Sequence, residues 1–210
     1  MIRVLIVDDH AILRRGLMQI ISEAPDMAVG GEAESGAQAI KLAREQPFDV
    51  VLLDITMPDR NGFDTLKQLK TEKPRLAVLM LSMHPEEHYA VRALKAGAAG
   101  YLNKQSAPGL LLSAIRQVAS GHRYVSPKVA EDLASAIARD TDRPLHETLS
   151  NREYETLRLM ASGRTSTQIA AELLLSVKTV SVYRSRLLEK LQLKNNAELT
   201  RYALQHRLVD

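Results

Sequence analysis

Three unbroken apolar runs divide the first half of this 210-residue chain, at residues 4–7, 50–53 and 78–81. A strand buried on one face alternates apolar with polar residues, whereas a strand buried on both faces is apolar throughout. The runs therefore predict strands of a parallel sheet that is covered on both sides by other elements.

Between these runs, apolar residues recur at the three- and four-residue spacing of an amphipathic helix. The segments with this spacing are 11–21, 37–44, 63–69, 90–95 and 110–118. Strands that alternate with such helices form β-α units, in which the helices cover the sheet. We therefore predict an α/β domain of five β-α units over residues 1–120.

The pattern changes after residue 120. Ser126 and Pro127 interrupt the chain, and residues 129–139 have the spacing of one short amphipathic helix. We assign residues 121–144 to a linker that carries this helix. Every later segment has helical spacing, so residues 145–210 are predicted to form a second, all-α domain of four helices.

Capping residues mark where those four helices begin. A Ser, Thr or Asn followed three residues later by Glu or Gln forms a capping box, which satisfies free amides at a helix start. The boxes are Ser150 with Glu153, Thr165 with Gln168 and Asn195 with Glu198, and Ser176 caps the remaining helix alone. Gly163 is placed to end the first helix in left-handed backbone.

The composition narrows the chemistry. The chain contains no cysteine, which excludes disulfides, thiolate metal sites and cysteine nucleophiles. Residues 143–210 hold 11 Lys and Arg against 7 Asp and Glu, whereas residues 1–142 hold 17 against 18. A basic excess this small suits a polyanionic partner but is equally common on solvated surfaces. The N-terminal apolar run is too short for a signal peptide or a membrane span, so we expect a cytoplasmic protein.

Polar residues stand where the predicted strands end. They are Asp8 and Asp9 after the first strand, Asp54 at the third, Ser82 at the fourth and Lys104 after the fifth. Parallel strands have their carboxyl ends at one edge of the sheet, where ligands bind. Three carboxylates there would repel one another unless a cation such as Mg²⁺ neutralised them. Lys104 and Ser82 would hold an incoming phosphoryl group, which makes Asp54 the candidate nucleophile.

Each of these residues also has an ordinary explanation. Asp8 or Asp9 alone is more often the N-cap of the next helix, Ser82 a turn residue and Lys104 a solvated cation. The phosphoryl-transfer hypothesis depends on all of them falling at strand ends, in order along the chain.

Four segments resemble the receiver domains of two-component signalling. They are Asp8, Asp9 and His10 after Val7, residues 54–58 with Gly62, Leu81 with Ser82, and residues 97–104. The resemblance covers about residues 1–120 and implies a flavodoxin-like (βα)5 fold. It implies that Asp54 accepts phosphate from a sensor histidine kinase and ligates Mg²⁺ together with Asp9 and the carbonyl of Thr56. Asp8 would act through water, and Ser82 and Tyr101 would be the switch pair.

One residue departs from the receiver pattern. Many receivers place Pro after the lysine, often in a cis peptide, and Gln105 stands there in this chain. Because cis peptides are nearly confined to bonds that precede proline, we predict a trans bond after Lys104.

The C-terminal domain resembles the LuxR-type helix-turn-helix of NarL/FixJ regulators over about residues 145–208. Residues 149–153, 161–163, 168–173 and 176–180 fit the order helix, turn, helix, turn, helix. Apolar residues that would build the shared core are Ile169, Ala170, Leu173, Val180, Leu187, Leu188 and Leu191. Residues 165–173 would be the scaffold helix and 176–191 the recognition helix, which fits the major groove of DNA.

The resemblance divides the exposed residues of this recognition helix by role. Ser181, Val182 and Ser185 would face bases, whereas Lys178, Thr179, Tyr183, Arg184 and Arg186 would contact phosphates. Charge alone would favour an ordinary solvated helix. Thr167 stands where the family commonly has Asn, and Tyr183 where it has His. The last helix, 195–206, would supply a dimer contact that matches a two-fold DNA site.

Together the two resemblances predict a phosphorylation-controlled transcription regulator that is not an enzyme. Its expected partners are a sensor histidine kinase, promoter DNA and a second copy of the chain on DNA, with RNA polymerase a further candidate. Phosphorylation would draw Ser82 inward, let Tyr101 take the vacated space and release residues 176–191 from masking by the receiver.

Two alternatives compete with this prediction. A phosphatase or phosphotransferase would need a second acid-base carboxylate two residues after Asp54, where Thr56 stands, and would leave residues 145–208 unexplained. A degenerate receiver that only binds proteins is the other, and the intact acidic set argues against it.

Overall fold

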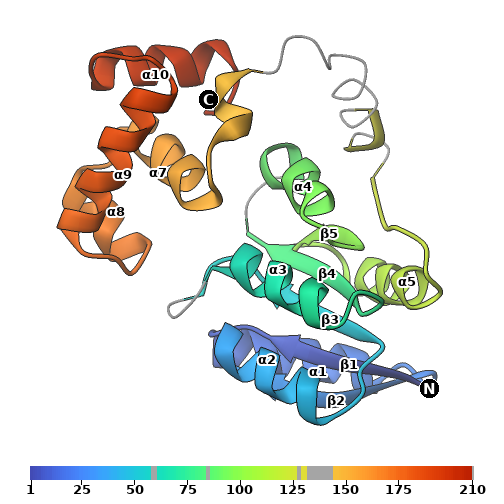
Figure 1. The fold of residues 1–210 in the computed structure, drawn as a ribbon. Coiled ribbons are helices and arrows are strands. Elements are labelled where there is room, and N and C mark those ends of the chain that lie inside the picture. Colours follow the sequence, from blue (N-terminus) through green and yellow to red (C-terminus); the bar gives the residue numbers. More distant parts are fainter. Residues whose placement is uncertain (58–60, 84–85, 127–128, 132–143, 210) are drawn as a thin grey trace. The chain divides into compact units, whose positions relative to one another are not determined.

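The computed structural model describes residues 1–57, 61–83, 86–126, 129–131 and 144–209 (Figure 1). The chain divides into two compact units, Met1–Ile137 and Ala138–Asp210. Among the described residues, no helix has both the length and the apolar character needed to cross a membrane.

The first unit alternates strands and helices. The strands are β1 (Ile2–Val7), β2 (Met27–Ala33), β3 (Val50–Asp54), β4 (Ala77–Ser82) and β5 (Gly100–Asn103). The helices are α1 (Ala11–Ser22), α2 (Gly36–Glu45), α3 (Gly62–Glu72), α4 (Glu86–Lys95) and α5 (Pro108–Ala119). The strands are parallel and lie in the order β2-β1-β3-β4-β5, which confirms the flavodoxin-like prediction (Figure 1).

Burial on both faces of the sheet explains the unbroken apolar runs. Val4 and Ile6 belong to a core that they share with residues of α1 and α5. Leu5 and Val7, which point to the opposite face, are 0% and 1% exposed. Right-handed crossovers in this strand order place α2, α3 and α4 on that opposite face, and α2 packs against α3.

The second unit contains helices throughout its described part. A short 3-10 helix, η1 (Leu145–Thr148), precedes α7 (Asn151–Ala161), α8 (Ser166–Glu172), α9 (Val177–Lys190) and α10 (Asn196–Gln205). The four predicted α-helices are confirmed. Their packing buries Ile169, Val180, Leu187 and Leu199 completely, whereas the predicted core residue Leu188 is partly exposed.

The predicted caps are present, with one difference. Ser150 and Thr165 both form complete capping boxes, and the Ser176 hydroxyl accepts a hydrogen bond from the Thr179 amide. Asn195 caps α10, but the Glu198 carboxylate accepts from the amide of Lys194 instead of Asn195. The box predicted there was therefore wrong in one bond, because the acidic side chain reaches one residue further back along the chain.

Two smaller predictions concern the backbone. Gly163 ends α7 with a φ of +82°, as predicted, and the described residues contain no cis peptide, so the bond after Lys104 is trans. The predicted linker helix at 129–139 lies outside the described residues except for 129–131, which are helical.

Candidate functional site

Three charged side chains meet at the carboxyl ends of the central strands. Asp8 follows β1 directly, Asp54 is the last residue of β3, and Lys104 follows β5. The Nζ of Lys104 lies 2.7 Å from Oδ2 of Asp8 and 2.7 Å from Oδ2 of Asp54. All three side chains are at most 4% exposed, so this predicted convergence of residues is present in the fold as a buried cluster.

Burial controls the protonation of Asp54. It raises the pKa of the Asp54 carboxyl to about 6, and the Asp8 charge adds to the rise, although Lys104 and the Thr56 amide oppose it. The Thr56 amide donates to Asp54 Oδ1 over 3.2 Å. A single ammonium group therefore offsets only part of the cost of placing two carboxylates out of water.

The buried carboxylate oxygens of the cluster fit a hard cation. Three oxygens are buried without a hydrogen bond of good geometry: Oδ2 of Asp8, Oδ1 of Asp9 and Oδ2 of Asp54. Lys104 approaches the oxygens of Asp8 and Asp54 to 2.7 Å, so these two contacts are close ion pairs. Ligand atoms of Asp8, Asp9, His10 and Asp54 all lie within 4.8 Å of one another. Carboxylate oxygens at this spacing are what Mg²⁺ binds in proteins, together with carbonyls and waters.

The predicted switch residues occupy two neighbouring strands, β4 and the edge strand β5. Ser82 ends β4 and Tyr101 lies within β5, and they are 1% and 2% exposed. The Lys104 amide donates to the carbonyl of Ser82 over 2.8 Å. The backbone that carries Lys104 is thereby tied to the strand that carries Ser82.

Gly62 lets the start of α3 lie against the end of β3. Its amide donates to the carbonyl of Ile55 over 2.9 Å. A Cβ at position 62 would overlap the carbonyl oxygen of Asp54 and approach Cα of Ile55 to 2.8 Å. Only a glycine lets α3 begin this close to the end of β3.

Two residues without a predicted role, His10 and Arg14, also lie at the site. His10 Nδ1 lies 2.9 Å from Asp9 Oδ1 and 3.3 Å from Asp8 Oδ1. Arg14, one helical turn further on, donates from Nη1 to the carbonyl of Asp8 over 2.7 Å and pairs with Glu32. The signal available in the sequence was their position at the start of the helix that follows Asp9.

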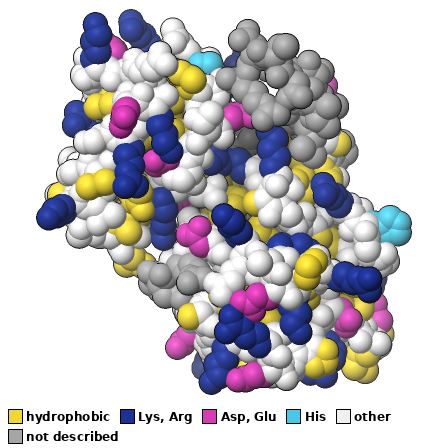
Figure 2. All heavy atoms as spheres, in the orientation of Figure 1, with side chains coloured by type: hydrophobic (Ala, Val, Ile, Leu, Met, Phe, Trp, Pro, Cys, Tyr) yellow, Lys and Arg dark blue, Asp and Glu magenta, His cyan; other side chains and the backbone are white. Residues whose placement is uncertain are grey.

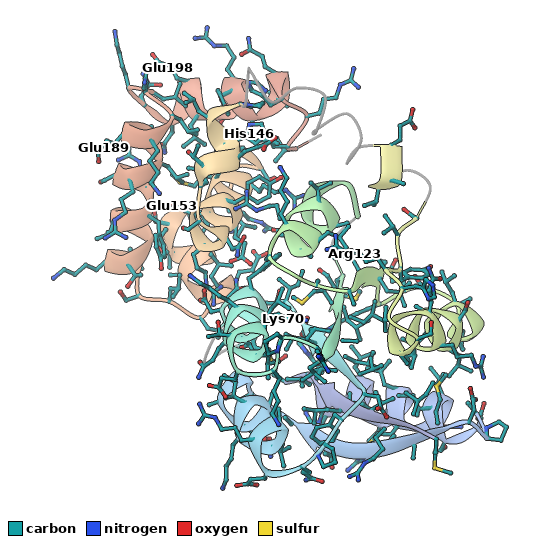
Figure 3. All side chains as sticks on the ribbon, turned by 45° about the vertical axis from the view of Figure 1, so that its right-hand side comes forward. Lys70, Arg123, His146, Glu153, Glu189 and Glu198 are labelled. Carbon is teal, nitrogen blue, oxygen red and sulfur yellow. The ribbon has the colours of Figure 1, made fainter. Side chains whose placement is uncertain are left out.

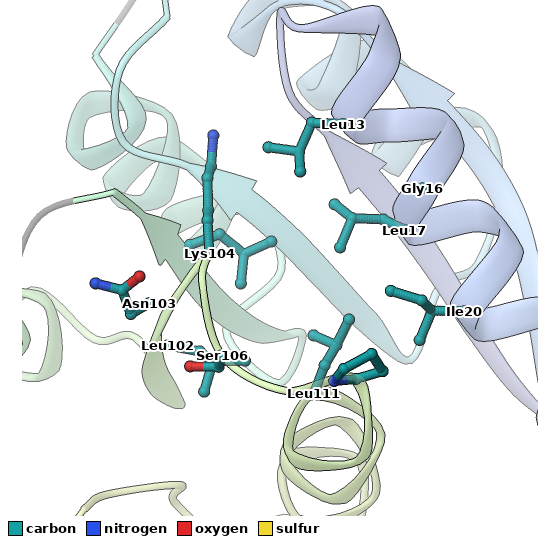
Figure 4. Close-up of a pocket in the computed structure, with 11 residues that line it drawn as sticks. Leu13, Gly16, Leu17, Ile20, Leu102, Asn103, Lys104, Ser106 and Leu111 are labelled. Carbon is teal, nitrogen blue, oxygen red and sulfur yellow. The ribbon is translucent and has the colours of Figure 1, made fainter.

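A small apolar pocket of about 110 Å³ lies beside Lys104, between α1 and the start of α5. Leu13, Leu17 and Ile20 line it from α1 and Leu111 from α5. The aliphatic stem of Lys104 stands among these residues, with its amine directed away from Leu111 (Figure 4). The apolar stem of Lys104 thus lies against apolar side chains while its charged end pairs with the carboxylates.

The second unit presents the predicted DNA-contacting residues on α9. Lys178, Ser181, Val182, Ser185 and Arg186 are exposed, and Thr179, Tyr183 and Arg184 are partly exposed. Basic side chains are spread over the surface of α7 to α10, with acidic ones among them (Figure 2). This mixture agrees with the modest basic excess of the sequence.

Three of these side chains already make contacts within the unit. Arg184 Nε donates to Asn196 Oδ1 over 2.7 Å, which links α9 to the start of α10. The hydroxyls of Ser181 and Ser185 donate to the carbonyls of Val177 and Ser181. A serine whose proton is used in this way offers only acceptor lone pairs to a partner.

The C-terminal end of α9 is held to α7 by an ion pair. Lys190 Nζ lies 2.7 Å from the Glu153 carboxylate on α7, which also accepts from the Ser150 amide. Burial raises the pKa of Glu153, but its hydrogen bonds from Lys190 and Ser150 outweigh this and hold the pKa below the usual range. Glu153, which completes the capping box of α7, thus also holds the C-terminal end of α9.

Comparison with known proteins identifies both units. The model of the response regulator receiver domain matches residues 4–116, and that of the bacterial regulatory proteins of the luxR family matches residues 147–203. The response regulator GacA of Pseudomonas aeruginosa is 37% identical over 212 residues, covering 100% of this chain and 99% of its own length. UvrY of Escherichia coli K12 is 37% identical over 99% of this chain and 96% of its own length.

Solved structures agree with this assignment. RcsB of Salmonella enterica serovar Typhimurium, bound to promoter rprA in the presence of the phosphomimetic BeF3⁻, matches with a TM-score of 0.63 and 28% identity over 96% of this chain and 98% of its own. A LuxR-family response regulator from Aurantimonas sp. matches 65% of this chain and 98% of its own with a TM-score of 0.60 and 34% identity. With its receiver domain, LuxR-type domain and full-length relatives, the chain belongs to the NarL/FixJ family of two-component response regulators, which are DNA-binding transcription regulators and not enzymes.

Proposed function

We propose that Asp54 is the phosphoacceptor and that its phosphorylation by a sensor histidine kinase controls promoter binding by α9. The observation that carries this proposal is the position of Lys104 Nζ, 2.7 Å from both Asp8 and Asp54 in a buried site. A buried ammonium held beside two carboxylates is placed to neutralise charge on a phosphoryl group transferred to one of them.

Each residue of the acidic site has a proposed role in the phosphoryl transfer. An Asp54 oxygen attacks the phosphorus as the bond to the donor breaks, and Lys104 and the Ser82 hydroxyl bind the transferred oxygens. Asp9, Asp54 and the carbonyl of Thr56 would hold Mg²⁺, with Asp8 acting through water. The ion would supply positive charge that neutralises the phosphoryl oxygens.

The added charge then acts on the switch residues. A phosphoryl group adds roughly −1.5 to −2 charges at Asp54. Ser82 moves toward the phosphate, and Tyr101 takes the space that it leaves, which changes the face formed by α4 and α5. Both side chains begin within the core, so a shift of one requires a shift of its neighbours.

The DNA-binding step uses α9. Ser181, Val182 and Ser185 face bases, while Lys178, Thr179, Tyr183, Arg184 and Arg186 contact phosphates. RcsB has been solved on promoter DNA, and as two dimers bound to two parallel DNAs, which supports binding of this chain as a dimer. We place the dimer contact on α10. Because promoter DNA is the proposed partner, we expect the protein to act in the cytoplasm. RNA polymerase is a further predicted contact.

Incubation with a small acyl phosphate and Mg²⁺, followed by intact-mass measurement and a promoter-binding assay, tests this proposal. Wild type should gain one phosphoryl group and bind DNA more tightly, and Asp54→Ala should do neither. Well-folded wild type without an adduct would favour the alternative of a degenerate receiver that only binds proteins.

Masking of α9 by the unphosphorylated receiver is a separate part of the proposal. If the receiver masks α9, full-length Asp54→Ala should bind its operator more weakly than phosphorylated wild type does. Equal affinity of the two proteins would contradict masking without affecting the assignment of Asp54.

A further inference from the structure

The imidazole of His10 lies at the edge of the acidic cluster described above. Its Nδ1 is 2.9 Å from Oδ1 of Asp9 and 3.3 Å from Oδ1 of Asp8. One ligand atom from each of His10, Asp8, Asp9 and Asp54 falls within 4.8 Å of all the others. The nitrogen therefore belongs to the same potential coordination shell as the carboxylates.

The spacing of these atoms matches that of ligands on one ion. Adjacent ligands of an octahedral ion with bonds of about 2.1 Å lie about 3.0 Å apart. The distances from His10 Nδ1 to the two carboxylates fall on either side of this value. A metal ion bound between the carboxylates is thus within reach of the imidazole without a change in the backbone.

The backbone holds His10 in this position. His10 is the N-cap of α1, with extended backbone, and its amide donates to Asp8 Oδ1 over 2.8 Å. Its side chain makes no capping hydrogen bond, and 67% of it is exposed. The imidazole is therefore placed by the chain but remains accessible to an ion that enters from solvent.

An imidazole changes which metals such a site prefers. Mg²⁺ takes oxygen ligands almost exclusively, whereas Zn²⁺, Ni²⁺ and Co²⁺ bind imidazole nitrogen well. The three carboxylates contribute buried oxygens in either case, since Oδ2 of Asp8 and Oδ2 of Asp54 face the Lys104 amine and Oδ1 of Asp9 faces His10. A shell of carboxylates with one imidazole suits a transition-metal ion better than the oxygen ligands alone.

We propose that His10 is a ligand for transition-metal ions at the receiver's acidic site, so that the protein binds Zn²⁺ or Co²⁺ there through His10 as well as Mg²⁺ without it. This inference rests on the proposed metal site at Asp9 and Asp54. The added ligand, His10, would distinguish transition-metal ions from Mg²⁺. Zn²⁺ would then compete with Mg²⁺ for the site.

Calorimetric titration of metal-free, full-length protein with Zn²⁺ and, separately, with Mg²⁺ tests the assignment. In His10→Ala the affinity for Zn²⁺ should fall at least about tenfold, as loss of a metal-site residue typically causes, while the Mg²⁺ affinity stays within about twofold. His10→Asn should behave in the same way and retains a good N-cap residue. The visible spectrum of bound Co²⁺ should also change in both variants, because a nitrogen ligand is lost.

Other histidines provide the controls. His122→Ala removes an exposed imidazole outside the cluster and should leave both affinities unchanged. The rings of His146 and His206 lie 5.1 Å apart in the second unit, so His206→Ala measures any Zn²⁺ that this pair binds. Zn²⁺ binding that depends on His206 but not on His10 would overturn the inference.

Asp9→Asn separates this inference from the proposal on which it rests. Mg²⁺ binding that is unchanged in Asp9→Asn would contradict the proposed metal site itself. Mg²⁺ binding that is lost in Asp9→Asn, with a Zn²⁺ affinity that His10→Ala and His10→Asn leave unchanged, would contradict only the role of His10. An equal loss of both ions in His10→Ala would also contradict it, since His10 would then not distinguish them.

Discussion

The amine of Lys104 lies 2.7 Å from the carboxylate of Asp54, and the two side chains are only 4% and 3% exposed. The same amine is equally close to Asp8. An ammonium in this position neutralises charge that the surrounding apolar core cannot. Its removal leaves two buried carboxylates, and among the described side chains Asp54 then has no other ion-pair partner.

Replacement of Lys104 by Met should therefore have two effects. Phosphoryl incorporation at Asp54 should fall at least about tenfold, because the positive charge that neutralises the transferred phosphoryl oxygens is lost. The receiver should also lose about 3 kcal/mol of stability at neutral pH. Intact mass after a timed incubation and urea denaturation measure these effects. Lys41→Met, which removes an exposed lysine on α2, is the control and should change neither quantity.

The raised pKa of Asp54 predicts a pH-dependent stability. On folding, that pKa rises from the ordinary 3.8 to about 6. The folded chain therefore holds the proton more tightly, and stability on the order of 3 kcal/mol, complete below pH 3.8, is lost as pH rises through 6. In metal-free buffer, Asp54→Asn should unfold at a higher urea concentration than wild type at pH 8, and at a similar one at pH 4.

A second variant tests whether the pH dependence is specific to the buried Asp54. Glu34→Gln removes an exposed carboxylate and should show the same difference from wild type at both pH values. If the Asp54→Asn difference were also independent of pH, burial would not be the cause of any stabilisation.

Gly62→Ala should disrupt the site by displacing the backbone around Asp54. The added Cβ would overlap the Asp54 carbonyl and press on Ile55, so α3 has to move away from the end of β3. We expect a loss of about 2 kcal/mol or more in stability and slower phosphorylation of Asp54. Gly16→Ala is the matched control, since its added Cβ meets no atom within 4 Å beyond its chain neighbours and its own helix backbone. It should stabilise α1 by up to about 1 kcal/mol.

Glu153→Ala should destabilise the second unit. Glu153 is 2% exposed and binds both the Ser150 amide and Lys190 Nζ, so its removal should cost about 2 to 3 kcal/mol in urea denaturation. Its lowered pKa means that this stability is present above the ordinary pKa and is lost as pH falls through the folded value. Glu189→Ala, whose side chain projects from α9 into solvent (Figure 3), should cost less than about 0.5 kcal/mol.

Salt dependence should separate the two classes of DNA contact on α9. Arg186→Ala should weaken promoter binding and reduce the slope of log affinity against log salt by about 1, because one phosphate contact is lost. Val182→Ala should cost about 1 kcal/mol with an unchanged slope, as expected for a base contact. Arg207→Ala, an exposed arginine outside α9, should alter neither. A reduced slope in Val182→Ala would contradict its assignment to bases.

Periodicity and punctuation in the sequence were sufficient to predict the elements and their class. Unbroken runs such as 50–53 predicted buried strands, and caps such as Ser150 and Thr165 predicted the starts of helices. These features are local, since burial on a strand or helix repeats with its own period and a cap bonds within one turn. Their order along the chain then placed Asp8, Asp54 and Lys104 at one edge of the sheet.

The tertiary structure decided what those residues contact. The pairing of Lys104 with Asp54, the bond from Lys190 to Glu153 and that from Arg184 to Asn196 join separate elements. The position of His10 beside both aspartates and the pKa of about 6 at Asp54 also depend on packing. No local pattern encodes these features, because distances between elements and the exclusion of water arise only when helices and strands pack together.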